Sequence, residues 1–380
     1  MPKQPLWLSN MDLLHPRYYL PTVYLYKPNG SANFFEATVL KEALGRVLVP
    51  FYPVAGRLAR DENGRIEINC NGEGVLFVVA DTDSTTEELG EFMPSMELRQ
   101  LIPTVDTNLE DISPNPLLLL QVTSFKCGGV CIGVGWHHTL ADGIGALHFI
   151  NSWATLARGL SITTPPLLDR TILRGRVPPK SIFHHVEYDP PPPMNTLTKN
   201  TKSQSLANFK ITLDHINSLK AKANNVESET KYTTYEILAA HIWRSVSKAP
   251  SPIALSGDLL SESFMCTVER IHREIKKMND EYLRSALDYL EEVGDVGDVN
   301  TIVRGSPTCA CPNLTVVSWM RLPFYKADFG WGAPLLMRPA TMFEGKGYIH
   351  PDPANEGSFS LALCLETDHM ESFRKLFYEF

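Results

Sequence analysis

The chain of 380 residues is longer than one hydrophobic core usually supports, so two lobes are expected. Its composition, with 43% hydrophobic and 21% charged residues, is that of an ordinary globular protein. The formal net charge is −8 and no run of lysine or arginine occurs, which argues against nucleic acid or an anionic membrane as a partner.

No apolar run approaches the ~20 residues that are needed to cross a bilayer. The first residues also lack the apolar segment of a secretory signal, so a cytoplasmic protein is expected. The seven cysteines are scattered, and Cys309 and Cys311 have no second pair nearby, so we expect reduced thiols and no metal site. No glycine-rich phosphate loop occurs, and no bound cofactor is predicted.

Helical and strand periodicities alternate irregularly through the first half of the chain. The predicted elements are, in chain order, a helix capped by Asn33 and ended by Pro50, strands at Arg65–Cys70 and Val75–Ala80 around the turn Asn71-Gly72, strands at Leu117–Phe125 and Val130–Trp136 forming a hairpin around Gly128-Gly129, and a helix at Gly143–Leu156.

A proline-rich and polar tract at residues 189–205 is typical of an extended linker. It separates a first lobe at 1–188 from a second lobe at 206–380. The elements predicted for the second lobe are a strand at Leu206–Leu213, a helix from the capping box Thr233–Glu236 to about Ser247, one or two helices within Glu262–Glu292, strands at Leu314–Met320 and Ser358–Leu365, and a closing helix at Met370–Tyr378. Without strict βαβ alternation, this order favours α/β lobes with mixed sheets.

The segment Val130–Gly143 carries the strongest functional signal. Alternate strand residues share one face, so an otherwise apolar row ends in a histidine: Val130, Ile132, Val134, Trp136 and His138. A histidine held rigidly at a strand-to-helix junction suits a general base. Asp142, four residues later, is placed to orient the histidine or its loop. Taken alone, the pattern also fits a buried histidine beside a helix-capping aspartate.

His138-Thr-Leu-Ala-Asp142-Gly resembles the HxxxDG signature of the BAHD acyltransferases, plant enzymes that use acyl-coenzyme A. Asp328–Gly332 (DFGWG) matches the second signature of that family. Further runs are similar to its hydroxycinnamoyl-CoA:shikimate/quinate hydroxycinnamoyltransferase branch: Leu48–Arg57, Arg65–Gly74, Glu97–Asp106, Phe125–Gly129, Leu147–Gly159, Phe183–Tyr188 and Tyr282–Tyr289. The resemblance covers nearly the whole chain.

The resemblance implies a chloramphenicol-acetyltransferase-like fold, in which two similar lobes enclose an active-site channel with His138 at its middle. It also implies direct transfer of a p-coumaroyl or caffeoyl group from CoA to an acceptor hydroxyl, in phenylpropanoid metabolism such as lignin biosynthesis. Acyl-CoA is then a co-substrate, and the protein is a monomer. We see no Ser or Cys in a nucleophile-elbow pattern, which fits transfer without a covalent acyl-enzyme.

The family also implies roles for other residues. Asp142 shapes the site, pointing away from substrate and pairing with an arginine. Trp319 directs its indole N–H at the developing oxyanion, although a strand tryptophan can equally pack in a core. Asp328, Gly330 and Gly332 are structural and remote from the histidine.

Substrate-binding positions carry over in the same way. Arg304 holds the acceptor carboxylate, because a guanidinium offers parallel donors in a fixed fork. Thr22 and Tyr24 lie near the phenolic end of the acyl group. Tyr19 and Val317 lie on the acceptor side, where this chain departs from the branch, which has histidine and threonine there. The loss of polar partners favours an aromatic or hydroxy-acid acceptor over shikimate.

The chain also departs from the family in length. It starts late in the family pattern, and an internal segment after His241–Ala249 is missing, with the arginine expected to pair with Asp142. Two other hypotheses therefore stand beside the active O-acyltransferase. One is a catalytically impaired relative that binds a phenolic ester or a protein. The other is an acyltransferase for amine acceptors such as polyamines, which need acidic residues in the acceptor pocket, whereas Arg304 is basic.

Overall fold

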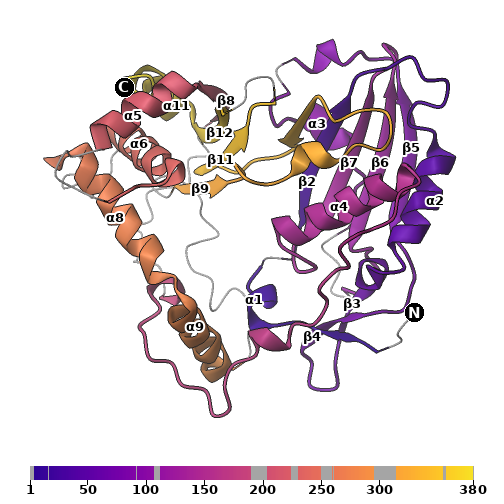
Figure 1. The fold of residues 1–380 in the computed structure, drawn as a ribbon, viewed down its shortest axis with the longest axis horizontal. Coiled ribbons are helices and arrows are strands. Elements are labelled where there is room, and N and C mark those ends of the chain that lie inside the picture. The colour runs from indigo at the N-terminus through magenta and orange to yellow at the C-terminus, as the bar shows by residue number, and fades with distance from the viewer. Residues whose placement is uncertain are drawn as a thin grey trace. The chain divides into compact units, whose positions relative to one another are not determined.

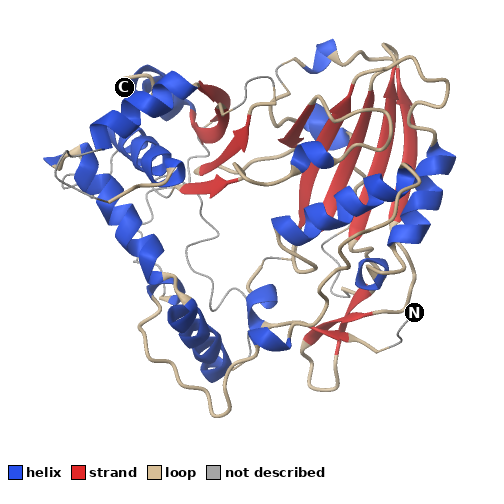
Figure 2. Cartoon of the chain, viewed as in Figure 1, coloured by secondary structure: helices blue, strands red, loops and turns tan. Residues whose placement is uncertain are grey.

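The computed structural model describes residues 4–15, 17–90, 92–106, 112–189, 203–223, 230–249, 259, 261–294, 314–353 and 357–379. The chain forms two compact units, whose elements are shown in Figures 1 and 2. Unit 1 comprises Met1–Asp189, Ser285–Val303 and Leu322–Thr341, and unit 2 comprises Pro190–Arg284, Arg304–Arg321 and Met342–Phe380.

Unit 1 is built on a five-stranded sheet of order β10-β2-β7-β6-β5. Its strands are β10 (Leu336–Pro339), β2 (Tyr19–Tyr26), β7 (Val130–His137), β6 (Leu118–Phe125) and β5 (Leu76–Thr82). β5 and β6 are parallel and the other pairs antiparallel, so the sheet is mixed. All eight residues of the middle strand β7 are buried, which shows that both of its faces are covered.

Helices α2 (Ala37–Val47) and α4 (Gly143–Ala157) lie across one face of this sheet (Figure 1). On the opposite face, the segment after α3 (Met96–Gln100) approaches β7 so closely that a Cβ at Gly133 would collide with the carbonyl oxygen of Leu101. β6 and β7 form the hairpin predicted from the sequence, with Gly128 at a φ of 82° in its turn. The hairpin thereby carries His138 to the end of a strand that is packed on both sides.

Two details of the first half differ from the sequence prediction. The strands on either side of Asn71-Gly72 form, but they are not a hairpin: β4 (Ile66–Asn69) pairs with β1 (Leu6–Trp7) and β3 (Arg57–Arg60), whereas β5 joins the large sheet. The Arg57 guanidinium donates to the carbonyl of Gly74 at 2.7 Å, which fixes the connecting segment away from a tight turn.

Helix α2 begins after Glu36 and not after the predicted cap Asn33. Phe35 has a φ of 51°, and this left-handed conformation separates the preceding turn from the helix. The Asn33 side chain instead accepts a hydrogen bond from the indole of Trp331 at 3.4 Å.

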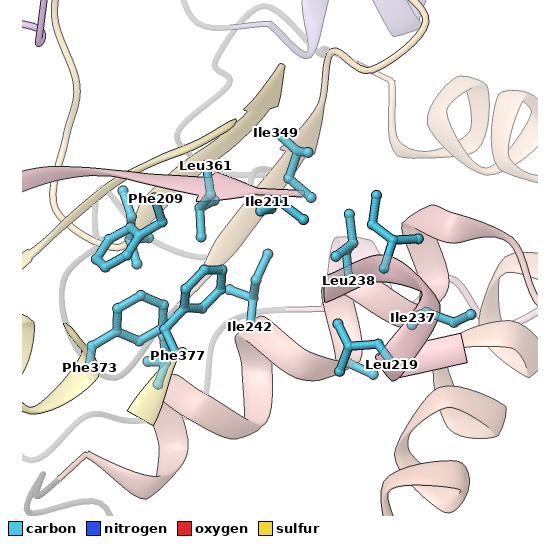
Figure 3. Packing of buried hydrophobic residues seen from close by; sticks show 14 of the residues in the cluster. Phe209, Ile211, Leu219, Ile237, Leu238, Ile242, Ile349, Leu361, Phe373 and Phe377 are labelled. Carbon is cyan, nitrogen blue, oxygen red and sulfur yellow. The ribbon is translucent and has the colours of Figure 1, made fainter. Parts of the chain in front are cut away.

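Unit 2 contains a second mixed sheet, of order β8-β12-β11-β9, in which β9 and β11 are parallel. The strands are β8 (Gln204–Ile211), β12 (Phe359–Glu366), β11 (Lys346–Pro351) and β9 (Thr315–Ser318), and the helices α5 (Leu213–Ala223), α6 (Thr234–Lys248), α8 (Phe264–Lys277) and α11 (Thr367–Leu376). The predicted capping box of Thr233 and Glu236 begins α6. Aromatic rings from β8 and α11 and aliphatic side chains from α6 form the core (Figure 3).

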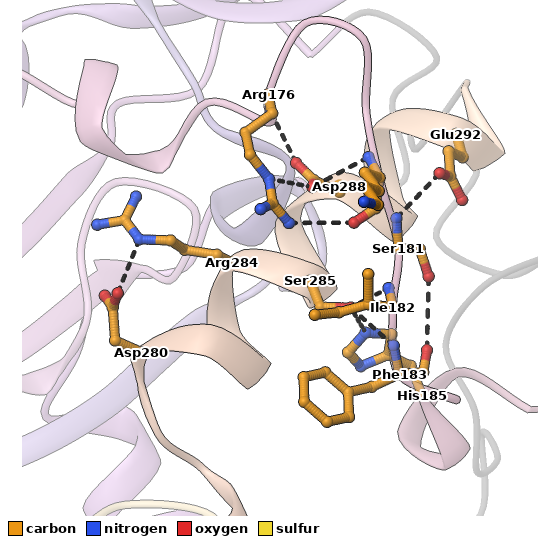
Figure 4. A network of polar contacts seen from close by, with 11 residues as sticks. Arg176, Ser181, Ile182, Phe183, His185, Asp280, Arg284, Ser285, Asp288 and Glu292 are labelled. Carbon is orange, nitrogen blue, oxygen red and sulfur yellow. Dashed lines mark hydrogen bonds and ion pairs between the residues drawn. The ribbon is translucent and has the colours of Figure 1, made fainter.

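The helical stretch predicted at Glu262–Glu292 is two helices, α8 and α9 (Asp280–Val293). The C-terminal part of α9 belongs to unit 1, where its buried Asp288 accepts hydrogen bonds from the Arg176 backbone, the Arg176 side chain and the Lys180 backbone (Figure 4). Ser285, one turn earlier, accepts from two backbone N–H groups of the same loop. The two units are therefore not the two halves of the sequence, although the predicted architecture of two mixed-sheet α/β lobes is confirmed.

Several sequence predictions lie outside the described residues. They concern Arg304, the pair Cys309 and Cys311, most of the linker at 189–205, and the chain just after Ala249.

Candidate active site

His138 directly follows β7, in a tight turn between the middle of the sheet and α4. Its backbone N–H donates to the carbonyl of Tyr18 at 3.1 Å, and Leu140 closes the turn by donating to the carbonyl of His137 at 3.0 Å. The His138 side chain is half-buried, whereas the residues on either side of it are buried. A fixed backbone and a partly open ring are what a general base requires.

Two rings from the chain before β2 surround the His138 imidazole. The ring of His15 stacks on it with centroids 3.9 Å apart and an interplanar angle of 12°. The ring of Tyr18 meets it edge-on at 6.0 Å. His15 could not be predicted from the sequence, because no periodicity or motif connects residue 15 with residue 138.

Arg170 connects the loop of the histidine motif with the segment that precedes His15. Its guanidinium donates to the carbonyl of Leu140 at 2.6 Å and forms an ion pair with Asp12 at 3.0 Å. Asp12 also closes the capping box of α1 (Asn10–Leu13) by accepting from the backbone and hydroxyl of Ser9. The short helix α1 and the loop of the histidine motif are thereby fastened to one cation. Arg170 lies in irregular chain without a pattern that would have marked it.

His137 lies on the other face of the strand end, because consecutive strand residues alternate. It is buried against the edge of the Tyr19 ring at 5.3 Å, and burial, with smaller contributions from the neighbouring His138 and Arg17, lowers the pKa of His137 to about 4. Tyr19 donates to the carbonyl of Pro116 at 2.5 Å, and burial raises the pKa of its hydroxyl to about 12. The hydroxyl of Tyr19, predicted on the acceptor side, thus has a partner in the protein.

Asp142 is the N-cap of α4. Its carboxylate accepts the backbone N–H of Gly145 at 2.8 Å, and the side chain is exposed. No ion pair to Asp142 occurs among the described residues, so the pairing with an arginine that the resemblance implies is not seen in this part of the chain. Its negative charge nevertheless raises the pKa of the nearby His15, against the larger, opposite effect of burial.

The positions predicted for the acyl ring lie on β2, opposite β7. Thr22 pairs with Val134, and Tyr24 with Ile132. Thr22 is half-buried, but Tyr24 is only 2% exposed, and burial and the neighbouring Tyr325 raise the pKa of its hydroxyl. Thr22 is therefore the more open of the two hydroxyls.

Val317 and Trp319 lie in unit 2, at and just beyond the end of β9. Both are half-buried and two residues apart, so they face the same way. The backbone of Trp319 donates to Ile349 at 2.8 Å, and its indole packs on the ring of Tyr348 at 4.3 Å. These contacts fix the indole on the sheet.

The DFGWG segment forms a turn within unit 1. The carboxylate of Asp328 accepts the N–H groups of Gly330 and Gly332 at 2.8 and 3.0 Å, and both glycines have φ values above 100°, which side chains rarely tolerate. Phe329 is buried edge-on against Trp153 of α4 at 4.7 Å, and Trp331 packs on Phe35 at 4.9 Å. The segment covers the helical side of the large sheet.

Within the described part of the chain, no helix combines the length and the apolar character that a membrane crossing requires.

The model of the Transferase family matches the chain in two pieces, residues 1–252 and 251–380. These pieces meet close to Ala249, after which the resemblance implies a missing segment. Shikimate O-hydroxycinnamoyltransferase from Nicotiana tabacum is 46% identical, and the match covers all of this chain and 96% of the relative. That alignment spans 422 positions although this chain has 380 residues, so parts of the relative have no counterpart here.

Two further relatives differ in the acceptor that their names give. Rosmarinate synthase from Plectranthus scutellarioides is 42% identical over all of this chain and 96% of its own length. A hydroxycinnamoyl-CoA:5-hydroxyanthranilate N-hydroxycinnamoyltransferase from Avena sativa is 43% identical over 99% of this chain and 95% of its own.

Solved structures show the same fold. TRI101 of F. sporotrichioides, crystallised with coenzyme A and T-2, has a TM-score of 0.79 at 19% identity over 98% of this chain and 97% of its own. Vinorine synthase has a TM-score of 0.67 at 20% identity over 98% of this chain and 93% of its own.

Proposed function

The chain belongs to the Transferase family, the BAHD acyl-CoA-dependent acyltransferases, and we propose that it transfers a hydroxycinnamoyl group from its CoA thioester to the hydroxyl of a carboxylate-bearing acceptor. The observation that carries the proposal is His138, half-buried after the middle strand of a sheet and fixed through its backbone to Tyr18. Names of relatives with at least 40% identity support the acyl group.

In the proposed reaction, His138 removes the proton of the acceptor hydroxyl while the oxygen attacks the thioester carbonyl. The tetrahedral intermediate then collapses, the carbon–sulfur bond breaks, and the CoA thiolate takes the proton from the imidazolium. A positioned general base contributes roughly 10²–10⁴-fold in rate. We assign the indole N–H of Trp319 to the oxyanion, a contribution of roughly 10²–10³-fold. His137 is unsuited as the base, because it is buried and its pKa lies near 4.

We infer that the acceptor is a carboxylic acid held by Arg304. Shikimate and 5-hydroxyanthranilate, which the names of two relatives give, both carry a carboxylate. The neutral side chain of Val317 offers no hydrogen bond to a polyhydroxylated ring, and Tyr19 already donates to Pro116. These features favour an aromatic hydroxy acid such as hydroxyphenyllactate over shikimate.

The test measures free CoA released from p-coumaroyl-CoA by the purified protein, with shikimate, quinate, hydroxyphenyllactate and 5-hydroxyanthranilate offered separately. We expect release that depends on the acceptor and is fastest with hydroxyphenyllactate. Val317→Thr is expected to improve shikimate relative to hydroxyphenyllactate, because it adds a hydroxyl that a polyol can use.

His138→Ala is the matched control, and we expect it to lose roughly 10²–10⁴-fold of the release rate. Normal turnover in His138→Ala would overturn the assignment of the base. A folded wild-type protein that releases no CoA with any acceptor, yet binds p-coumaroyl esters saturably, would instead favour the binding protein. The family model matches in two pieces, and this observation supports the binding protein as a second candidate function.

A further inference from the structure

We propose that His15 is a positioning residue for His138: its ring fixes the plane of the catalytic imidazole by stacking and stabilises the positive charge that this imidazole takes up during transfer. The inference rests on the proposed function, because it assumes that His138 is the base. It adds a residue that belongs to neither signature motif, and it starts from the near-parallel contact of the two rings, 3.9 Å between centroids and 12° between planes.

A histidine ring has no strongly preferred rotation about its last side-chain bond, because this torsion joins a tetrahedral and a planar carbon. The backbone hydrogen bond from His138 to Tyr18 fixes the main chain but not the ring plane. A flat neighbour in contact with one face removes that freedom. The Tyr18 ring meets that of His138 edge-on, with centroids 6.0 Å apart and 80° between the planes. The stacked ring of His15 is therefore the nearer constraint on the plane of the imidazole.

His15 is itself held to the same support as the motif loop. It follows directly after α1 and its C-cap Leu14. Arg170 binds Asp12 of α1 and the carbonyl of Leu140 in the loop, so a displacement of α1 relative to His138 would break one of these contacts. The stack is therefore part of a connected arrangement and not a contact between two free side chains.

The charges around His15 suit this role. Burial lowers the pKa of His15, while Asp12 of α1 and Asp142 at the start of α4 act in the opposite direction. Arg170 is paired with Asp12, and His138 stacks on the His15 ring. At neutral pH His15 is then an uncharged aromatic ring, and such a ring attracts a cation over its face. The imidazolium of His138 gains this attraction in the transition state, and two charged histidines would lose it.

Two substitutions distinguish the effect of a flat ring at position 15 from the effect of side-chain volume. His15→Phe keeps an aromatic face but cannot take a proton, and His15→Leu fills similar space without a flat face. We expect His15→Leu to lower kcat roughly tenfold with little change in KM, because a misplaced base slows the chemical step. His15→Phe should stay within about twofold of wild type, because the stacked face remains. Equal losses in both variants, or no loss in His15→Leu, would overturn the proposal.

A second readout does not need turnover. The pKa of His138 is measured by NMR titration of its ring in wild type, His15→Phe and His15→Leu, after circular dichroism has shown that each is folded. We expect His138 to bind its proton about threefold more weakly in His15→Leu than in His15→Phe, because the leucine offers no aromatic face to the cation. Equal values would contradict the inference. A wild type without turnover would end the proposed function, while this titration would still decide the role of His15.

Discussion

His137 and His138 are adjacent in the chain, but strand alternation gives them different surroundings. The ring of His138 is half-buried against His15, and that of His137 is buried against Tyr19. In the described residues, Nδ1 of His137 has no hydrogen-bond partner that would stabilise a proton on this nitrogen. We therefore expect His137 to affect the stability of the fold more than catalysis.

The pH dependence of stability follows from this burial. The pKa of His137 falls from an ordinary value of about 6.5 to about 4, so the unfolded chain binds this proton more readily than the folded one. The contribution to folding is complete above about pH 6.5 and is lost as the pH falls towards 4. We expect the free energy of unfolding to decrease by about 3 kcal/mol over this range on account of His137.

Urea unfolding at a series of pH values measures this decrease, with His137→Phe as the comparison. The variant should show a shallower loss of stability at acid pH, whatever its stability at neutral pH. Parallel curves for the two proteins would contradict the prediction. His241 in unit 2, whose pKa burial also lowers to about 4, is expected to add a similar slope of its own.

Asp142 has two roles, and different substitutions can test them separately. It caps α4 through Gly145, and its charge acts on His15. Asp142→Asn keeps an oxygen for the cap and removes the charge, whereas Asp142→Ala removes both. We expect Asp142→Ala to lower the free energy of unfolding by about 1 kcal/mol and Asp142→Asn by much less. Chemical denaturation of the three proteins checks the prediction, and equal losses in both variants would show that the charge, not the cap, is what stabilises.

At the scale of elements, one buried carboxylate of α9, that of Asp288, binds the loop at residues 176–180. Burial alone would raise the pKa of Asp288, but hydrogen bonds from Arg176 and Lys180 outweigh it and hold the pKa below its ordinary value. Asp288→Ala would leave three donors without their acceptor. We expect a loss of about 3 kcal/mol in the free energy of unfolding, because hydrogen bonds to a buried charge are costly to break.

A matched control lies two turns earlier on the same helix. Asp280 pairs with Arg284 at 2.8 Å but is exposed, and Asp280→Ala is expected to change stability by less than about 0.5 kcal/mol. Urea denaturation of both variants provides the comparison. Similar small losses in both would mean that the Asp288 network does not stabilise the helix.

Elements that depend on local pattern could be predicted from the sequence. Turn glycines and two apolar runs indicated the β6–β7 hairpin, and the capping box indicated the start of α6. The pairing of β5 could not be predicted, because a guanidinium–carbonyl contact 17 residues apart decides where the chain turns after β4. The roles of His15 and Arg170 could not be predicted for the same reason. Their partners are distant in sequence, and periodicity reports only on neighbours.

For the whole molecule, sequence order and spatial grouping differ. β10 pairs with β2 although more than 300 residues separate every pair of partners, and part of α9 also belongs to unit 1. Contacts of this kind close long loops and make unit 1 depend on chain from both halves of the sequence. The two-lobe class followed from length and mixed periodicity, but no local signal showed that late segments of the chain join unit 1.

The break in the family match bears on the whole molecule as well. The two matched pieces meet at residues 251–252, and the resemblance to the family implies a strand and loop at this point that the chain lacks. A sheet that misses a strand exposes backbone groups and apolar side chains that the strand would cover. Restoring the corresponding segment of the tobacco relative after Ala249 is therefore expected to raise stability.

The chimera is compared with wild type and with a second chimera that carries the same residues in scrambled order. Each kcal/mol gained should raise Tm by about 1–2 °C for a chain of this length, and only the ordered segment should produce a gain. CoA release is measured on all three proteins. A gain in both Tm and kcat would show that the missing segment limits folding and turnover together, whereas equal Tm values would show that the shorter chain closes its sheet without it.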